Sequence, residues 1–322
     1  MDPQQPPYRH PAPRGRAGVK PEAFAAVMAT GIVSIAAADH GLDYLSVPLA
    51  AVAVLSLPVL MYLTAVRWRS YDLQDIDTVV GLFTYVAACS VLASRFAEHR
   101  WVVWVFGVMA LQGWTALMPM LWMRMRRLGL TGLRDRAHGT WELASVATSG
   151  LSIVFMAGGI MFWAFIFWVL ALGLYCVMTT LIAWRALGEP EARRNVPPDH
   201  WILMGGLAIA TLAGEHIHAE LHPGPLAAAV RGTTLVTLGV ATVQILPLAV
   251  TSWRQMLDWP AVFPLGMYSA ATYAIFVETG WQPLDVVSQV FFWIALVAWL
   301  LVMTIVVRQV VRLTSGYGLR PE

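Results

Sequence analysis

The stretch from Trp259 to Phe276 combines an apolar composition with features that a purely structural membrane helix does not need. It reads WPAVFPLGMYSAATYAIF and carries no charged residue. Pro264 removes a backbone hydrogen-bond donor and Gly266 removes a side chain, so the helix is weakened next to Phe263. Irregular backbone is tolerated in a membrane where it lines a cavity. We therefore predict that this stretch lines a pore and that Phe263 plugs it.

Titratable residues elsewhere could carry proton or metal chemistry. Glu142 begins an apolar segment, as either a solvated helix-start carboxylate or the proton-coupling group of a carrier. His218 and His222 are four residues apart in EHIHAELH and could bind a metal ion together with Glu215. The alternative for that segment is a wet outer loop or a pH-sensitive mouth. No cofactor is indicated.

The composition places the chain in the membrane class. Of its 322 residues, 58% are hydrophobic and 12% are charged, whereas globular domains carry about 25% charged residues. A net charge of +2 gives no reason to expect nucleic-acid binding. No apolar segment holds the paired His, Asp and Glu groups that an enzyme would need. Cys89 and Cys176 fall inside apolar segments, where cysteine acts as a small hydrophobic residue.

Ten apolar segments have lengths that suit membrane-spanning helices. We expect an all-α integral membrane protein with one helix per segment. The segments are Ala23 to Ala38, Val47 to Val66, Asp77 to Ser94, Trp101 to Met123, Thr140 to Gly159, Met161 to Trp184, Trp201 to His216, Leu226 to Val250, Ala261 to Phe276 and Val286 to Val307.

Three regions follow from this pattern. Residues 1–20 are rich in proline and basic residues, which is typical of a disordered cytoplasmic tail. Residues 21–312 form the transport domain, and residues 313–322 form a second short cytoplasmic tail. A secretory signal peptide that ends near Ala36 to Ala38 is an alternative interpretation of the start.

The basic residues orient the ten segments. With the amino terminus in the cytoplasm, only Arg95, Arg100 and Arg231 of the 21 Lys and Arg residues fall on the outer side. Such an asymmetry is what the positive-inside rule requires of an even number of spans. We expect a multi-pass protein of a bacterial cytoplasmic membrane with both termini in the cytoplasm. Arg231 either snorkels to the surface or pairs with Glu215 or Glu220.

The segments alternate in side-chain size. Gly, Ala, Ser and Thr supply 43 of the 86 residues in the odd-numbered segments and 32 of the 114 residues in the even-numbered ones. Small residues allow helices to approach closely or leave a lumen open. We predict five successive helical hairpins, with the odd helices lining a central pore and the even helices outside them. The eighth segment is an exception, because it is also rich in small residues.

Several blocks resemble the tellurite-resistance and C4-dicarboxylate transporter family, which includes the plant guard-cell slow anion channels and their bacterial homologues. The clearest are FAAVMATGIVS (Phe24 to Ser34), GLFTYVAACSVLASR (Gly81 to Arg95) and VFPLGMYSAATY (Val262 to Tyr273). HGTWELASVATSG, WILMGGLAIATLAG and QILPLAVTSW extend the similarity over nearly all of residues 21–312. The resemblance implies a pseudo-five-fold arrangement of five hairpins around one pore, with homotrimers of such subunits.

The resemblance also assigns roles to residues. Phe263 resembles the phenylalanine that occludes the family's pore, and Phe83 is a second aromatic residue expected near this gate. Pro264 and Gly266 are expected to line the pore. Hydroxyl groups on the odd segments could solvate an ion there or bond to their own helix carbonyl groups. They are Thr30, Ser34, Thr84, Ser145, Thr148, Thr211, Tyr268 and Thr272.

The expected function is transport of small anions, inorganic ions or small carboxylates, through a pore gated by Phe263. The alternative is a proton-coupled carrier for C4-dicarboxylates, sulfite or tellurite-related oxyanions. The depth of Phe263 in the membrane has two interpretations, because Phe263 lies only about one helical turn after Trp259. Either the helix begins earlier, near Arg254 or Gln255, or the gate lies nearer the cytoplasm than the middle of the pore.

Overall fold

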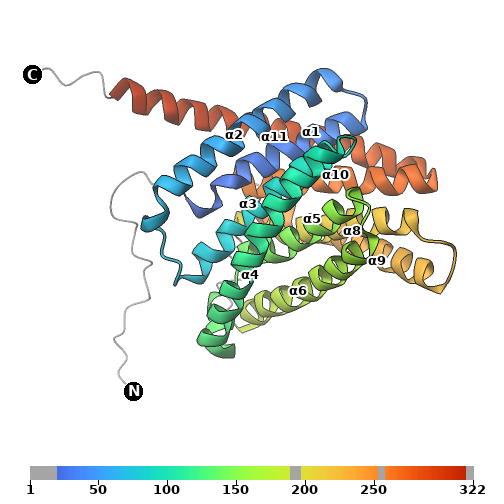
Figure 1. The fold of residues 1–322 in the computed structure, drawn as a ribbon, viewed down its shortest axis with the longest axis horizontal. Coiled ribbons are helices and arrows are strands. Elements are labelled where there is room, and N and C mark those ends of the chain that lie inside the picture. The colour runs from blue at the N-terminus through green and yellow to red at the C-terminus, as the bar shows by residue number, and fades with distance from the viewer. Residues whose placement is uncertain (1–19, 189–196, 253–257, 317–322) are drawn as a thin grey trace, which may run out of the picture.

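The computed structural model describes residues 20–188, 197–252 and 258–316, and within these residues all regular structure is helical (Figure 1). Ten helices are long and apolar enough to cross a membrane, which confirms the predicted number of spans. They are α1 (Ala25–Asp39), α2 (Asp43–Val66), α3 (Ile76–Arg95), α4 (Arg100–Arg136), α5 (Leu143–Ala157), α6 (Met161–Gly188), α8 (Trp201–Glu220), α9 (Pro225–Ser252), α10 (Trp259–Thr279) and α11 (Gln282–Gly316).

The boundaries of the two expected tails and of one helix differ from the observed ones. Residues 1–19 of the expected first tail lie outside the described residues. The last helix, α11, continues to Gly316, beyond residue 313 where we expected the second tail to begin. Helix α4 runs beyond the expected end at Met123 and reaches Arg136, with a break at Gly129, whose φ is 64°. Glycine adopts this left-handed conformation without a steric penalty.

Consecutive helices pack as five hairpins, α1 with α2, α3 with α4, α5 with α6, α8 with α9 and α10 with α11. The first helices of these hairpins also pack against one another. Helix α1 contacts α3 and α10, α5 contacts α3 and α8, and α8 contacts α10, so the five close into a ring. We call α1, α3, α5, α8 and α10 the ring helices and the other five the outer helices.

Burial separates the two sets. In the most apolar 18-residue window of each ring helix, between 67 and 83% of the residues are buried, against 22 to 39% in the outer helices. The outer helices expose large apolar side chains such as Tyr62, Trp101 and Phe162. Such a surface suits contact with lipid tails. The size alternation in the sequence therefore corresponds to an alternation between interior and exterior helices.

The ring helices begin at the same end of the bundle. Short 3-10 turns precede three of them, namely η1 (Pro21–Phe24), η3 (Gly139–Glu142) and η4 (Pro198–His200). These turns contact α3, α8 and α10, and η3 also contacts η4. We call this end the N-terminal face of the ring and the opposite end the C-terminal face.

Small residues allow the ring helices to approach closely. A Cβ atom at Gly31 of α1 would lie 2.7 Å from Cγ1 of Val91 on α3. One at Gly150 of α5 would lie 2.8 Å from Cβ of Ser90, also on α3. Real Cβ atoms do not come this close, so these two positions require glycine for the observed spacing of the helices.

Helix α9 explains the exceptional eighth segment. Thr237 of α9 lies 2.8 Å from Thr211 of α8, hydroxyl oxygen to hydroxyl oxygen. A Cβ atom at Gly214 of α8 would lie 2.6 Å from the hydroxyl oxygen of Thr234 on α9. The small residues of α9 therefore serve close, partly polar packing against α8, although α9 is an outer helix.

Candidate functional site

Phe263 lies close to the N-terminal face of the ring. Helix α10 begins at Trp259, where the carboxylate of Asp258 caps it by accepting a hydrogen bond from the backbone N–H of Trp259 at 2.8 Å. Pro260 occupies the first turn, where its missing N–H costs nothing. The segment 253–257, which holds the earlier expected start, lies outside the described residues. Of the two interpretations, the described helix start fits a gate one turn from this face.

The contacts of α10 define which side of the helix meets which neighbour. Pro264 packs at Gly205 of α8, where an added Cβ atom would lie 3.0 Å from Cγ of the proline. Gly266 packs at Ile32 of α1, with 3.0 Å between an added Cβ atom and Cγ2 of the isoleucine. Phe263 itself is fully buried, with 0% of its surface exposed.

The remaining side of α10 faces the outer helices. The hydroxyl oxygens of Tyr268 and Thr242 of α9 are 2.7 Å apart. Ser269 donates to the backbone carbonyl oxygen of Ser288 on α11 at 2.8 Å. Tyr268 and Ser269 are thus held at the boundary between the ring and the outer helices.

Phe83 of α3 is also fully buried. On the same helix, Val91 packs at α1 and Ser90 packs at α5. Tyr85 faces Gly113 of α4, where an added Cβ atom would lie 3.0 Å from its ring. Both aromatic residues of the expected gate therefore sit on ring helices, inside the protein.

The eight candidate hydroxyl groups all have partners. Thr84 and Thr272 bond to backbone carbonyl groups of their own helices, those of Gly81 at 2.7 Å and Tyr268 at 2.8 Å. The other six bond to outer helices. The pairs are Thr30 with Trp299 Nε1 (2.8 Å), Ser34 with Ser46 O (2.8 Å), Ser145 with Ala171 O (3.1 Å), Thr148 with Trp114 Nε1 (2.9 Å), Thr211 with Thr237 Oγ1 (2.8 Å) and Tyr268 with Thr242 Oγ1 (2.7 Å).

Glu142 lies in a different environment from the solvated helix start that was one of its two interpretations. Its side chain is fully buried at the start of α5. Oε1 accepts a hydrogen bond from the hydroxyl of Thr179 on α6 at 2.6 Å, and Oε2 has no hydrogen-bond partner among the described residues. The solvated interpretation is wrong, because α6 and the neighbouring helices cover this helix start.

A polar cluster at the N-terminal face was not foreseen from the sequence. His138, just before η3, contacts two aspartates through its two ring nitrogens. Nδ1 is 2.7 Å from Oδ2 of Asp199 on η4, and Nε2 is 3.1 Å from Oδ1 of Asp77 on α3. Thr140 donates to Asp199 from its backbone N–H and its hydroxyl, each at 3.0 Å, and Trp141 Nε1 donates to Asp77 at 2.9 Å.

The cluster keeps His138 protonated at neutral pH. Burial lowers the pKa of the imidazole, but the hydrogen bonds and the negative charges of Asp199 and Asp77 more than offset this effect. The net result raises the pKa of His138 to about 9. The backbone approaches closely here too, since a Cβ atom at Gly139 would lie 2.3 Å from the carbonyl oxygen of Asp199. One cation thus ties together three of the five hairpins at the N-terminal face.

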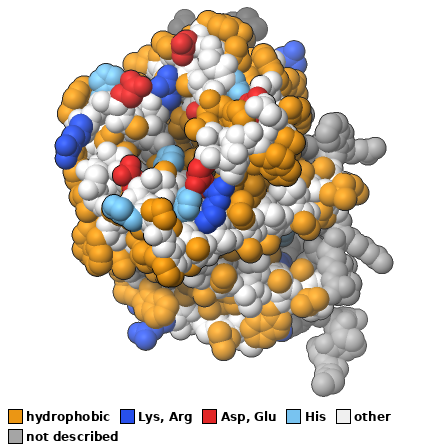
Figure 2. Space-filling view, turned by 90° about the vertical axis from the view of Figure 1, so that its right-hand side faces the viewer, with side chains coloured by type: hydrophobic (Ala, Val, Ile, Leu, Met, Phe, Trp, Pro, Cys, Tyr) orange, Lys and Arg blue, Asp and Glu red, His pale blue; other side chains and the backbone are white. Residues whose placement is uncertain are grey.

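The C-terminal face carries a second ionic cluster. Arg231 of α9 donates to both carboxylate oxygens of Glu215 on α8, at 2.8 and 3.0 Å, and also to Glu278 of α10. The predicted pairing with Glu215 is confirmed, whereas the second partner is Glu278 rather than Glu220. Figure 2 views this end of the molecule, where acidic, histidine and arginine side chains gather within a mostly apolar surface.

The candidate metal ligands meet in this second cluster. Nδ1 of His218 lies 2.5 Å from Oε1 of Glu278. Glu215, His218 and Glu278 each offer an atom within 4.8 Å of the others, and His222 is not part of this group. Arg231 already forms ion pairs with both carboxylates of the group. The structure thus shows an ion-pair network at this place, and metal binding by His218 and His222 stays a prediction.

Comparison with known proteins identifies the family. Residues 18–307 match the family described as voltage-dependent anion channel (SLAC1). The chain belongs to this family. Two strains of Mycobacterium tuberculosis, CDC 1551 / Oshkosh and H37Rv, each have an uncharacterized membrane protein that is 29% identical over 141 residues. That similarity covers 39% of this chain and 71% of each mycobacterial protein.

Family membership confirms the resemblance seen in the sequence blocks. It establishes a multi-pass membrane protein of a family of anion channels, with ten helices able to span the membrane. Membership of this family indicates transport rather than an enzymatic reaction.

Proposed function

We propose that the chain conducts small anions through the interior of the ring and that Phe263 is the gate. The observation that carries this proposal is the position of a fully buried phenylalanine on a ring helix, beside a proline and a glycine that pack against the two neighbouring ring helices. A bulky aromatic side chain at such a point would block the passage of ions and water.

The helical register of α10 supports an inward direction for Phe263. Successive residues of an α-helix are rotated by about 100°. Pro264 and Gly266 point toward α8 and α1, whereas Tyr268 and Ser269 point toward the outer helices. Phe263 projects between the first two directions and away from the last two. This is the direction of the ring interior.

The helical register of α3 likewise supports an inward direction for Phe83. Ser90 and Val91 direct one side of α3 toward α5 and α1, and Tyr85 directs the other side toward α4. Phe83 lies on the side of Ser90 and Val91, opposite Tyr85. Phe83 is thus suited to narrow the passage together with Phe263.

A neutral interior suits rapid passage of anions. Among the described residues, Asp, Glu, Lys and Arg occur only near the ends of the ring helices. A fixed positive charge inside the pore would hold an anion too tightly to release it. Because most of the candidate hydroxyl groups are engaged at the outer helices, we expect selection by size and by ease of dehydration more than by direct hydrogen bonding.

Replacing Phe263 tests the gate. Phe263→Ala removes the ring, so we expect chloride efflux from proteoliposomes to rise at least about tenfold, which requires only a small change in barrier height. Phe162→Ala is the matched control, because Phe162 is exposed on the outer helix α6. Unchanged efflux in Phe263→Ala at equal protein incorporation would contradict the gate.

A second candidate function is proton-coupled transport of C4-dicarboxylates, sulfite or tellurite-related oxyanions. The buried carboxyl group of Glu142, whose one hydrogen-bond partner among the described residues is Thr179, favours it. A carrier of this kind needs a carboxyl group whose protonation changes during the transport cycle.

Glu142→Gln tests the carrier, because the amide keeps the shape of the acid but cannot exchange a proton. If the carrier exists, uptake driven by a pH gradient is lost, while Glu220→Gln, an exposed control at the end of α8, retains it. Anion flux that is independent of the pH gradient in the wild type rejects the carrier and leaves the channel.

The proposal also covers how the subunits assemble and how the chain is oriented in the membrane. We expect homotrimers with one pathway per subunit in a bacterial cytoplasmic membrane, with both termini in the cytoplasm. The mass of the protein in native membranes tests the trimer. Labelling of single cysteines introduced near each terminus, in sealed cells and in lysed cells, tests the orientation.

A further inference from the structure

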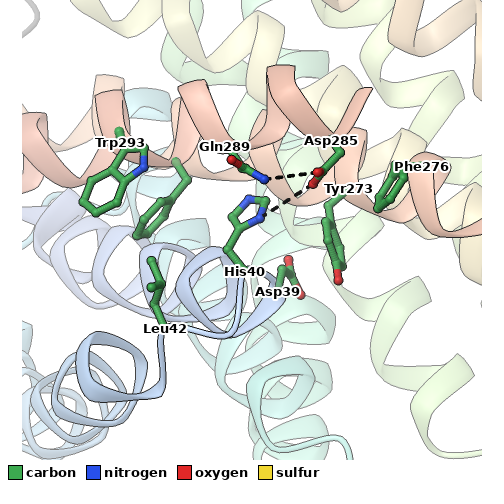
Figure 3. A pocket seen from close by; sticks show the side chains of 9 residues that line it. Asp39, His40, Leu42, Tyr273, Phe276, Asp285, Gln289 and Trp293 are labelled. Atoms are coloured by element: carbon green, nitrogen blue, oxygen red, sulfur yellow. Dashed lines mark hydrogen bonds and ion pairs between the residues drawn. The ribbon is translucent and has the colours of Figure 1, made fainter. Parts of the chain in front are cut away.

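A cavity of 360 Å³ opens on the C-terminal side of the molecule, where the end of α1 meets α10 and the start of α11 (Figure 3). Asp39 and His40 enter it from α1, Tyr273 and Phe276 from α10, and Asp285 and Trp293 from α11. A volume of this size is sufficient for a small organic molecule.

The charged groups that line the cavity are acidic. Asp39 and Asp285 contribute two carboxylates, and no Lys or Arg is among the lining residues. Asp285 accepts a hydrogen bond from the amide of Gln289 at 3.1 Å and lies 4.0 Å from Nδ1 of His40.

Asp39 is partly exposed at the cavity, and its carboxylate has no hydrogen bond or ion pair among the described residues. Arg95 is near enough to interact with it electrostatically. The guanidinium group of Arg95 is engaged elsewhere, however, because it donates to the hydroxyl groups of Ser34 at 2.9 Å and Ser46 at 2.8 Å. A carboxylate at the wall of a cavity with no direct partner is a group that a bound cation would stabilise.

His40 does not supply that cation at neutral pH. Burial lowers the pKa of its imidazole, and the charge of Asp285 and the hydrogen bond with Ser288 offset only part of this effect. Nε2 of His40 lies 3.0 Å from the hydroxyl oxygen of Ser288, which fixes the ring at the wall of the cavity.

Aromatic rings form much of the rest of the wall. The centroids of His40 and Tyr273 are 5.3 Å apart, those of Tyr273 and Phe276 are 5.9 Å apart, and those of Phe292 and Trp293 are 4.9 Å apart. The faces of aromatic rings attract organic cations by about 0.5–2 kcal/mol. Carboxylates surrounded by several rings are a typical arrangement for binding an ammonium group.

A single metal ion fits this cavity less well. Among the described residues, the only group of His, Cys, Asp and Glu with ligand atoms close enough to share one ion is Glu215, His218 and Glu278. Asp39, His40 and Asp285 are therefore spaced too widely for one ion, whereas an alkylammonium ion can contact a carboxylate and two rings at once.

We propose that the cavity between α1, α10 and α11 is a binding site for an organic ammonium ion, with Asp39 and Asp285 as its charge partners and Tyr273 and Trp293 as its aromatic walls. The ammonium group could be supplied by a soluble amine or by the ethanolamine headgroup of a lipid, because both present the same chemistry. This site lies on the C-terminal side of the molecule, whereas Phe263 lies near the start of α10 at the N-terminal face.

The experiment measures binding rather than transport, so its result does not depend on the proposed anion pathway. The full chain is placed in nanodiscs of phosphatidylglycerol, and 2-phenylethylammonium is titrated by calorimetry beside the uncharged 2-phenylethanol. We expect the ammonium ion to bind at least about tenfold more tightly than the alcohol. Equal affinity for the two probes, or no binding of the ammonium ion, overturns the proposal.

Two variants test whether Asp39 and Asp285 bind the ammonium group. Asp39→Asn and Asp285→Asn each keep the side-chain shape and are expected to weaken ammonium binding about tenfold. Asp43→Asn is the matched control, since Asp43 is exposed nearby and does not line the cavity, and it should bind as the wild type does. Wild-type affinity in both cavity variants overturns the assignment.

A second set of nanodiscs, containing phosphatidylethanolamine, distinguishes the sources of the ammonium group. Weaker apparent binding of 2-phenylethylammonium in these nanodiscs supports the proposed site with a lipid headgroup as the occupant. Unchanged binding supports the same site with a soluble amine as the occupant.

Discussion

The two faces of the ring hold ionic clusters of opposite design. At the N-terminal face a histidine, His138, lies between two aspartates that come from α3 and η4. At the C-terminal face an arginine, Arg231, lies between two glutamates from α8 and α10. Both clusters tie neighbouring hairpins together through a central cation. They differ in whether that cation can lose its charge.

This difference has a direct consequence for stability. A guanidinium group stays charged throughout the working pH range of a protein. The pKa of His138 is about 9, so its positive charge is lost in moderately alkaline solution. Alkaline pH should therefore loosen the N-terminal face and leave the ionic contacts of the C-terminal face intact.

The largest effect is expected from breaking the arginine cluster. Arg231→Met leaves the buried carboxylate of Glu215 without its cation, and losing one partner of a buried pair costs about 3 kcal/mol. Thermal unfolding in detergent micelles measures the change. Arg100→Met, an exposed position at the start of α4, is the control.

A second variant separates the charge effect from lost packing. Adding Glu215→Gln to Arg231→Met removes the stranded negative charge, so part of the lost stability should return. No recovery in the double variant would mean that Arg231 acts through packing rather than through its ion pairs.

The pH dependence of the N-terminal face is the next largest effect. The folded pKa of His138 lies above its ordinary value of 6.5, so its stabilising contribution is fully present below pH 6.5 and is lost as the pH rises through 9. We expect a loss of about 1–3 kcal/mol over this range, since the side chain is partly exposed. Unfolding temperatures recorded across this range measure the loss.

His138→Gln should have lower stability than the wild type at neutral pH and a flatter profile over the same range. His99→Gln, at an exposed histidine before α4, should retain the wild-type profile. If His138→Gln kept the full alkaline loss, another group would be responsible and the contrast between the two faces would fail.

The smallest effect is expected between the two faces, where the contacts carry no charge. Thr237→Val removes the hydroxyl contact with Thr211 and should cost about 0.5–1 kcal/mol, independent of pH. Thr304→Val is the control, because Thr304 is exposed on α11 and bonds only to its own helix. If Thr237→Val destabilised the protein as much as Arg231→Met does, the position of a contact between the two faces, rather than its charge, would decide how much it stabilises the fold.

The sequence predicted some site contacts and missed others for identifiable reasons. Arg231 and Glu215 lie near the adjoining ends of two consecutive spans, so their pairing followed from the hairpin alone. His138 is 61 residues from each of its two aspartates, and nothing in the local sequence indicates which hairpins meet. The signal that could have found the cluster is polar residues at the starts of several odd-numbered segments.

The burial of Glu142 could not be predicted from the sequence either. Its position at the start of an apolar segment allowed a solvated or a buried carboxyl group. The choice depends on Thr179, which α6 brings to 2.6 Å from the carboxylate. The hydroxyl groups of Thr30 and Thr148 were ambiguous in the same way, because their indole partners come from α11 and α4.

The sequence by itself determined the number of spans, the hairpin order and the alternation of small and bulky helices. It could do so because a span must cover the membrane with apolar residues, and because close packing requires small side chains within the helix itself. Only the tertiary structure decided the rest. Closing the ring brings α10 beside α1, so the surroundings of Phe263, the partners of His138 and the cavity around Asp39 depend on helices far apart in the chain.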